Sequence, residues 1–73
     1  MESLRPLDVL NKNKGKEILV ELKNSTIYKG KLETFDIHLN LVLSDSTEIK
    51  DKNEQNSGTI LIRGDTITII KNL

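Results

Sequence analysis

The sequence predicts a mainly all-β domain, in which one short N-terminal helix precedes five antiparallel strands that form a small open barrel. Three observations support this prediction. The chain has only 73 residues, enough for one domain over 1–73. Apolar and polar residues alternate at strand spacing along most of the chain after its first fifteen residues. A glycine interrupts one alternating segment, as happens where a sheet curls.

The composition limits how such a small domain can be stabilised. A chain of this length buries only about 60% of the surface that it exposes when unfolded, so its own core gives little stability. It has no cysteine, which excludes disulfides and thiolate metal sites and favours a reducing environment. With one histidine, a metal site within one subunit is not expected, and no cofactor is indicated. Self-association is the remaining way to stabilise the fold.

Charge and hydropathy indicate where the protein acts. The N-terminal segment MESLRPLDVL lacks the features of a secretory signal, and no apolar run approaches the roughly 20 residues of a membrane-spanning helix. We therefore expect a cytoplasmic protein with no membrane partner.

Eleven basic and eleven acidic residues give a formal net charge of zero. Binding of a polyanion would therefore need a local, repeated cluster of charge.

The first element is predicted as a helix over residues 4–11. Ser3 could cap it, and Leu7 and Leu10 are three residues apart on one face. Pro6 is compatible only with the first helical turn, so the helix should begin near residue 4 or 5.

The next segments are predicted as strands. KEILVELK places Ile18, Val20 and Leu22 on one side of a strand and charged residues on the other, and NST is typical of a turn. IYKGKLETFD contains Gly30, which indicates a bend or bulge, and its apolar alternation shifts between Leu32 and Phe35. The register of the strand should therefore change at that point.

The C-terminal third is predicted as a polar hairpin loop over 50–58 and two strands within 59–73. In these strands apolar residues are contiguous, which is typical of strands covered on both faces. An exposed β-branched edge such as TITII would be prone to aggregation unless it is paired. We therefore expect the last two strands to pair with a neighbouring subunit.

The segment FDIHLNLVLSD, residues 35–45, contains the first candidate site. Its apolar residues occupy every second position, which predicts a strand with His38 and Asn40 on the opposite side, after a turn around 36–40. A lone histidine is more often an ordinary surface residue, and no spacing supplies the partners of a catalytic site. As a pair, however, the imidazole could stack on a base and the carboxamide could read the base's edge.

The second candidate site is Arg63-Gly64-Asp65, between the two C-terminal apolar runs. It could be an ordinary β-turn, or an adhesion tripeptide, which the lack of a secretory signal disfavours. Alternatively, Arg63 supplies a planar cation that stacks on bases or binds phosphate, and Asp65 buttresses the loop or Asn40. If the two loops meet, the side chains form one cluster, but periodicity alone does not show that they meet.

FDIHLNLVLSD followed by ILIRGDTITII resembles the two signature motifs of the Sm and Sm-like (LSm) RNA-binding family, and is most similar to its archaeal members. The first motif would span 16–46, with Gly30, Asp36 and Asn40 at characteristic positions, and the second 59–73. With the leading helix, the resemblance covers nearly the whole chain.

The resemblance implies the Sm fold, a strongly bent five-stranded SH3-like barrel capped by the helix. It also implies a homoheptameric ring, in which the fourth strand of one subunit pairs with the fifth of the next. U-rich single-stranded RNA would bind at the central pore, one base per subunit. His38 and Arg63 would sandwich a uracil, and Asn40 would bind its edge, helped by backbone amides of Gly64 and Asp65. Asp65 would also brace the Asn40 loop.

Three positions test the match to the family. Leu39 stands where many members have methionine, and Thr66 where asparagine is frequent. Arg63-Gly64 replaces the lysine–histidine pair of the bacterial Hfq branch, which disfavours a hexameric ring of that type.

The function predicted is a non-enzymatic scaffold or chaperone in RNA processing or ribonucleoprotein assembly. One alternative is a protein-interaction barrel that binds no RNA. An enzyme using His38 and a carboxylate is the least favoured alternative.

Overall fold

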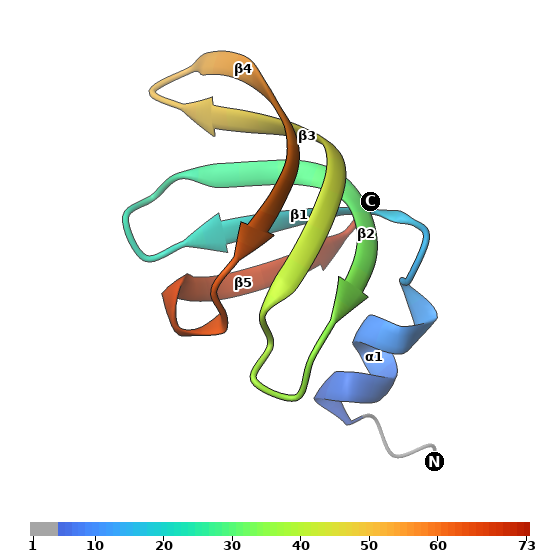
Figure 1. The fold of residues 1–73 in the computed structure, drawn as a ribbon. Helices are drawn as coiled ribbons and strands as arrows, with labels where there is room; N and C mark the ends of the chain where they lie inside the picture. Colours follow the sequence, from blue (N-terminus) through green and yellow to red (C-terminus); the bar gives the residue numbers. More distant parts are fainter. Residues whose placement is uncertain (1–4) are drawn as a thin grey trace.

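The computed structural model describes residues 5–73, and in them one helix is followed by five antiparallel strands (Figure 1). A short 3-10 turn precedes the last strand. The elements are α1 Pro6–Lys12, β1 Glu17–Leu22, β2 Ile27–Phe35, β3 Leu41–Lys50, β4 Asn53–Ile62, the 3-10 turn Gly64–Thr66 and β5 Ile67–Asn72. The predicted fold class, a helix followed by a five-stranded antiparallel sheet that curls into an open barrel, is confirmed.

Helix α1 begins at Pro6, which lies in the first turn as its missing N–H requires. Compared with the prediction of 4–11, the helix extends one residue further, to Lys12, while residue 4 and the proposed cap Ser3 lie outside the described residues. Leu10 is buried in the core, but Leu7 is at the surface. Among residues 5–73, no helix is long and apolar enough to cross a membrane.

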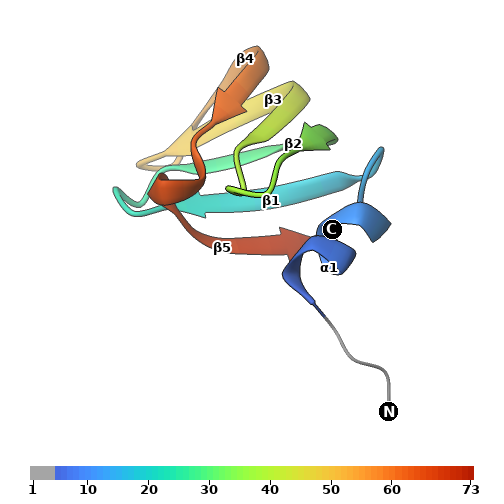
Figure 2. The same ribbon diagram turned by 60° about the horizontal axis from the view of Figure 1, so that its bottom comes forward.

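The strand order in the sheet is β4-β3-β2-β1-β5. Figure 2 shows the strands in this order, with β5 lying beside β1 and α1 close to the end of β5. All four strand pairs are antiparallel. The two edges of the sheet are therefore formed by β4 and β5, the last two strands of the chain.

Strand β2 bends at Gly30, as predicted. Its pairing with β3 shifts register between Lys29 and Lys31, around the glycine. A Cβ at Gly30 would lie 3.1 Å from both the Ser44 carbonyl oxygen and Ser46 Cα, so the backbones of β2 and β3 approach closely here. A second shift between Leu32 and Thr34 confirms the predicted change of register. The two irregularities allow β2 and β3 to curl over the core.

The core is small and lies on the inner face of the curled sheet. It consists of Leu10, Ile18, Val20, Leu32, Leu41, Leu43 and Ile62. Alternate residues of β1 and β3 point into it, while the residues between them face outward. Seven buried side chains make a thin core, which agrees with the limited stability expected of this chain length.

The prediction of a loop over 50–58 is wrong. The connection between β3 and β4 consists only of Asp51 and Lys52, which have φ angles of 52° and 67°, and the polar residues after it form β4. Two residues in the left-handed region make a tight hairpin turn. The strand lacks apolar alternation because this part of β4 is exposed and contributes no side chain to the core. Its backbone pairing with β3 needs no particular side chain.

Candidate nucleic-acid interface

The segment 36–40 is a tight turn between β2 and β3, and its shape is determined by Asp36. One carboxylate oxygen of Asp36 accepts hydrogen bonds from the backbone N–H groups of His38 and Asn40, at 2.9 and 3.1 Å. The Leu39 N–H donates to the Asp36 carbonyl at 3.0 Å, and Leu39 has a φ of 63°. An aspartate that bonds backbone groups two and four residues ahead stabilises such a turn.

The prediction of a turn around 36–40 is confirmed, but the alternation through 35–45 does not reflect a continuous strand. Ile37 occupies a position assigned to the core by alternation, and it is 76% exposed in the turn. His38 and Asn40 therefore share a loop and not one face of a strand. Alternation begins again only at Leu41, where β3 starts.

Asn40 connects this turn to the turn after β4. Its amide nitrogen donates to Asp36 at 3.0 Å, and its amide oxygen accepts from the Gly64 N–H at 2.8 Å. Gly64 approaches so closely that a Cβ would overlap the His38 carbonyl oxygen and lie 2.9 Å from the Leu39 carbonyl carbon. The two candidate loops, 24 residues apart at this bond, therefore meet in space.

Two predictions about the second loop need correction. Asp65 was expected to brace the Asn40 loop, but Asp36 does so, and the described contact of the Asp65 carboxylate is with Arg63, at 3.8 Å. The 3-10 turn Gly64–Thr66 leaves Asp65 exposed to solvent. The Gly64 amide, which was expected to help bind a base, instead donates to Asn40.

The resemblance to the family places Asp36 at a characteristic position, but it implies no role for this residue. The signal was available in the spacing, since an aspartate is followed by a histidine two residues later and an asparagine four residues later. The side chain of Asn40 lowers the pKa of Asp36 by donating a hydrogen bond. Desolvation opposes this shift, and the hydrogen bonds from the backbone N–H groups of Asn40 and His38 add to it, so the net effect is a lowered pKa. Asp36 is therefore a carboxylate at neutral pH, able to accept hydrogen bonds and unable to donate them.

His38 lies two residues before Asn40, and Arg63 lies directly before Gly64. Both side chains are exposed. The Arg63 side chain is 76% exposed, and its contact with Asp65 is long and open to solvent. Such an ion pair is weak, so the guanidinium is available for stacking or for binding phosphate.

In the described part of the chain, no three His, Cys, Asp or Glu side chains are arranged to hold a metal ion.

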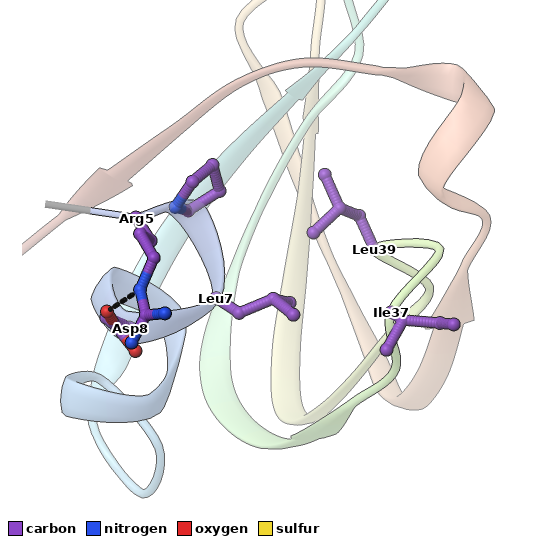
Figure 3. Close-up of a pocket in the computed structure, with 6 residues that line it drawn as sticks. Arg5, Leu7, Asp8, Ile37 and Leu39 are labelled. Atoms are coloured by element: carbon purple, nitrogen blue, oxygen red, sulfur yellow. Dashed lines mark hydrogen bonds and ion pairs between the residues drawn. The ribbon is translucent and has the colours of Figure 1, made fainter.

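Next to the 36–40 turn lies an apolar cleft of about 640 Å³, between the start of α1 and the turn. It is lined by Arg5, Pro6, Leu7, Asp8, Ile37 and Leu39. Figure 3 shows Leu7 extending toward the turn that carries Ile37 and Leu39, with the Arg5–Asp8 ion pair, 2.8 Å long, on the helix beside it.

The two edge strands expose apolar side chains. Leu61 on β4 is 65% exposed and Ile69 on β5 is 44% exposed. Unpaired strand edges with apolar side chains are ready to pair with another chain.

A model of the LSM domain matches residues 8–72 of this chain. Among curated proteins, an snRNP Sm-like protein of Thermococcus sibiricus is 49% identical over 67 residues, which cover 90% of this chain and 88% of the relative.

Two solved structures are similar over nearly the full length. A heptameric archaeal Sm protein superposes with a TM-score of 0.87 at 38% identity, covering 90% of this chain and 97% of the other. The Sm protein of Pyrococcus abyssii, solved in complex with a uridine heptamer, superposes with a TM-score of 0.91 at 41% identity, covering 96% and 100% of the two chains.

Proposed function

The chain belongs to the LSM domain family, and from this premise we propose that it forms a ring of identical subunits that binds U-rich single-stranded RNA at a central pore. The family is one of RNA-binding proteins and not of enzymes. The observation that carries the proposal is the Asn40 amide, which is held between two loops by Asp36 and Gly64.

The base is read by the Asn40 amide. A carboxamide offers two donors and two acceptor lone pairs, and one of each is used inside the protein. The remaining N–H and lone pair are available for a base. His38 and Arg63 are exposed and each lies close in sequence to one partner of the contact, and they stack on the two faces of the ring. The Asp65 backbone amide contributes a further donor.

The ring closes through the edges of the sheet. The unpaired edge of β4 in one subunit joins that of β5 in the next, which covers Leu61 and Ile69. Support comes from the strand order, which leaves these two strands at the edges, and from the likeness to a heptameric archaeal Sm protein. On this likeness we propose a homoheptamer.

Ring closure also supplies the charge that one subunit lacks. A neutral chain still presents one exposed Arg63 per subunit, so the copies together form a basic rim. The binding of RNA by such a rim weakens as salt is added, because counterions compete for phosphate.

In the cell we propose a scaffold or chaperone role in RNA processing or ribonucleoprotein assembly. The support is the similarity to snRNP Sm-like proteins and to the Pyrococcus abyssii protein solved with a uridine heptamer.

A protein-interaction ring without RNA is the second candidate, favoured by the apolar cleft beside α1 (Figure 3). A ring that assembles normally but shows no salt-dependent binding of oligo(U) would favour this candidate.

The site is tested with Asn40→Ala and Arg63→Ala, using fluorescence anisotropy with labelled oligo(U) and oligo(C). Base stacking is worth about 1–3 kcal/mol per base, so Arg63→Ala should weaken oligo(U) binding by about tenfold or more, with the ring intact by light scattering. Asn40→Ala should do the same by removing the edge contacts.

Asn56→Ala and Lys52→Ala are the matched controls, because both residues are exposed at or near the β3–β4 hairpin turn. They should bind as the wild type does. Unchanged affinity in both site variants, or equal affinity of the wild type for oligo(U) and oligo(C), would rule out the assigned site.

A further inference from the structure

Helix α1 has one buried side chain, that of Leu10, and we propose that the helix opens and closes over the 36–40 turn in a manner coupled to RNA binding. In the open state α1 leaves the barrel while the sheet stays folded. In the closed state it covers Leu39, which lies between His38 and Asn40 in the turn. This inference rests on the proposed function, because it concerns how binding at the same site is regulated.

The packing of α1 against the barrel is loose. Leu10 is 4% exposed, whereas Leu7 and Val9 are each 37% exposed. Clefts lie on both sides of the helix. The cleft of about 640 Å³ separates it from the 36–40 turn, and a second cleft of about 230 Å³ lies between it and Ile70 on β5. Since close-packed interiors leave few such voids, α1 rests on the barrel without interlocking with it.

No polar contact compensates for this loose packing. Among the residues that the structure describes, no hydrogen bond or ion pair joins residues 5–14 to a strand. The ion pair between Arg5 and Asp8 is internal to this segment. The first bond to the sheet comes from the Gly15 N–H, which donates to the Leu32 carbonyl at 2.7 Å. Helix α1 can therefore leave the barrel without breaking a bond in the sheet.

The helix is too short to persist on its own. It has seven residues, and isolated helices shorter than about 12–15 residues are marginal in water. Detachment and unwinding are therefore one event, in which the α1 amides lose their helical hydrogen bonds. Local opening of this kind is measured as the exchange of amide hydrogens with solvent, and segments with few buried apolar contacts open most easily.

The 36–40 turn connects α1 to the candidate base site. Leu39 is half-buried and lines both clefts, and Figure 3 shows Leu7 extending from α1 toward this turn. Leu39 also has a φ of 63°, a conformation that a leucine keeps only where its surroundings hold it. The closed helix is part of those surroundings. It therefore supports the turn conformation that presents His38 and Asn40.

Coupling between two sites acts equally in both directions. If the closed helix raises the affinity for oligo(U) by some factor, bound oligo(U) favours the closed helix by the same factor. Such factors are typically about 5–150. We therefore expect bound oligo(U) to slow the exchange of the α1 amides, and loss of α1 docking to weaken the binding of oligo(U).

The first experiment measures hydrogen exchange of the wild-type ring by mass spectrometry, without and with saturating oligo(U). In the free ring the α1 amides should exchange at least about tenfold faster than those of β2 and β3, and oligo(U) should slow them at least about fivefold. The exposed β3–β4 hairpin turn lies away from α1 (Figure 1) and is the control, with equal exchange in both states. Amides of α1 that are as protected as those of the sheet would overturn the inference.

The second experiment removes the buried contact with Leu10→Ala. The α1 amides should then exchange freely, the sheet amides should stay protected, and oligo(U) should bind at least about fivefold more weakly to a ring that is intact by light scattering. Val9→Ala, at an exposed position on the same helix, is the matched control and should bind as the wild type does. Wild-type affinity in Leu10→Ala, with its α1 amides exchanging freely, would overturn the coupling.

Two substitutions of Asn11 test the opening without changing the core, because this side chain is exposed on α1. They also serve if Leu10→Ala does not fold. Alanine favours a helix over glycine by about fivefold, so the α1 amides should exchange about fivefold faster in Asn11→Gly than in Asn11→Ala. Equal exchange in the two variants would show that α1 does not open by itself.

The proposed function and the coupling fail in different ways. A wild-type ring that does not bind oligo(U) would refute the proposed function, and the coupling with it. Oligo(U) that binds the ring but leaves the exchange of α1 unchanged would refute only the coupling.

Discussion

At the scale of single residues, the candidate site depends on three groups that hold one another. Asp36 shapes its own turn, Asn40 bridges to the next one, and Gly64 allows the two backbones to come into contact. Gly64 is needed here for space, since any side chain would collide with the carbonyl group of His38. The site therefore depends on a missing side chain as much as on those present.

Gly64→Ala should separate the two loops. The new Cβ would overlap backbone, which cannot move aside as a flexible side chain can, so the bond from Gly64 to Asn40 should be lost. We expect oligo(U) binding, measured by anisotropy, to fall at least about tenfold, in line with the loss of a bidentate base contact.

Gly15→Asn is the control for Gly64→Ala. Nothing lies within 4 Å of a Cβ at Gly15, and asparagine tolerates its φ of 83° better than most residues. This variant should bind oligo(U) normally. Wild-type affinity in Gly64→Ala would mean that the contact between the loops is not needed for binding.

At the scale of elements, the sheet ends in two strands that have a neighbour on one side only. β4 pairs with β3 and β5 pairs with β1, and each exposes an apolar side chain. Natural proteins usually protect such edges with charges, prolines or covering segments. These edges lack that protection at Leu61 and Ile69, which is why we propose that they pair between subunits.

Leu61→Lys should prevent ring assembly. The side chain is exposed in the isolated subunit, so the substitution leaves the core unchanged, but in a ring it would bury a charge in an apolar contact. We expect light scattering to report monomers or small oligomers, with the far-ultraviolet circular dichroism of a folded β protein.

Ile69→Lys, on the opposite edge, should give the same result, because both edges take part in each contact. Asn53→Lys, at the exposed start of β4, should leave the ring intact. An intact ring in both edge variants would contradict the proposed pairing of β4 with β5.

At the scale of the whole molecule, the ring would convert a weak site into a strong one. One subunit has a net charge of zero, and we propose one base site on it. Linked sites that bind one strand together raise the overall affinity by factors of about 10²–10⁴ when the geometry allows simultaneous binding. The thin core of one subunit would also gain stability from its neighbours.

The affinity of the wild-type ring for oligo(U) should therefore rise steeply with the length of the oligonucleotide and level off once all sites are occupied. Leu61→Lys, as a monomer, should bind long oligo(U) about 10²–10⁴-fold more weakly than the ring does. Anisotropy titrations at one salt concentration measure both. A monomer that binds as tightly as the ring would show that avidity contributes nothing.

The sequence by itself determined the order of the elements, the bend at Gly30, the change of register after Leu32 and the core face of most strands. These features depend on contacts between near neighbours in the chain or on regular alternation, which can be read directly from residue types. The family motifs likewise lie in short continuous segments.

Only the tertiary structure decided that residues 53–58 form a strand, that Asp36 and not Asp65 holds Asn40, and that the two loops meet. The hairpin strand is formed by backbone hydrogen bonds, which leave no apolar pattern in the sequence. The contact between Asn40 and Gly64 joins residues 24 positions apart. Such a contact exists because β3 pairs with β4, with Leu41 opposite Ile62, which brings the turn before β3 beside the turn after β4. No local pattern in the sequence records this pairing.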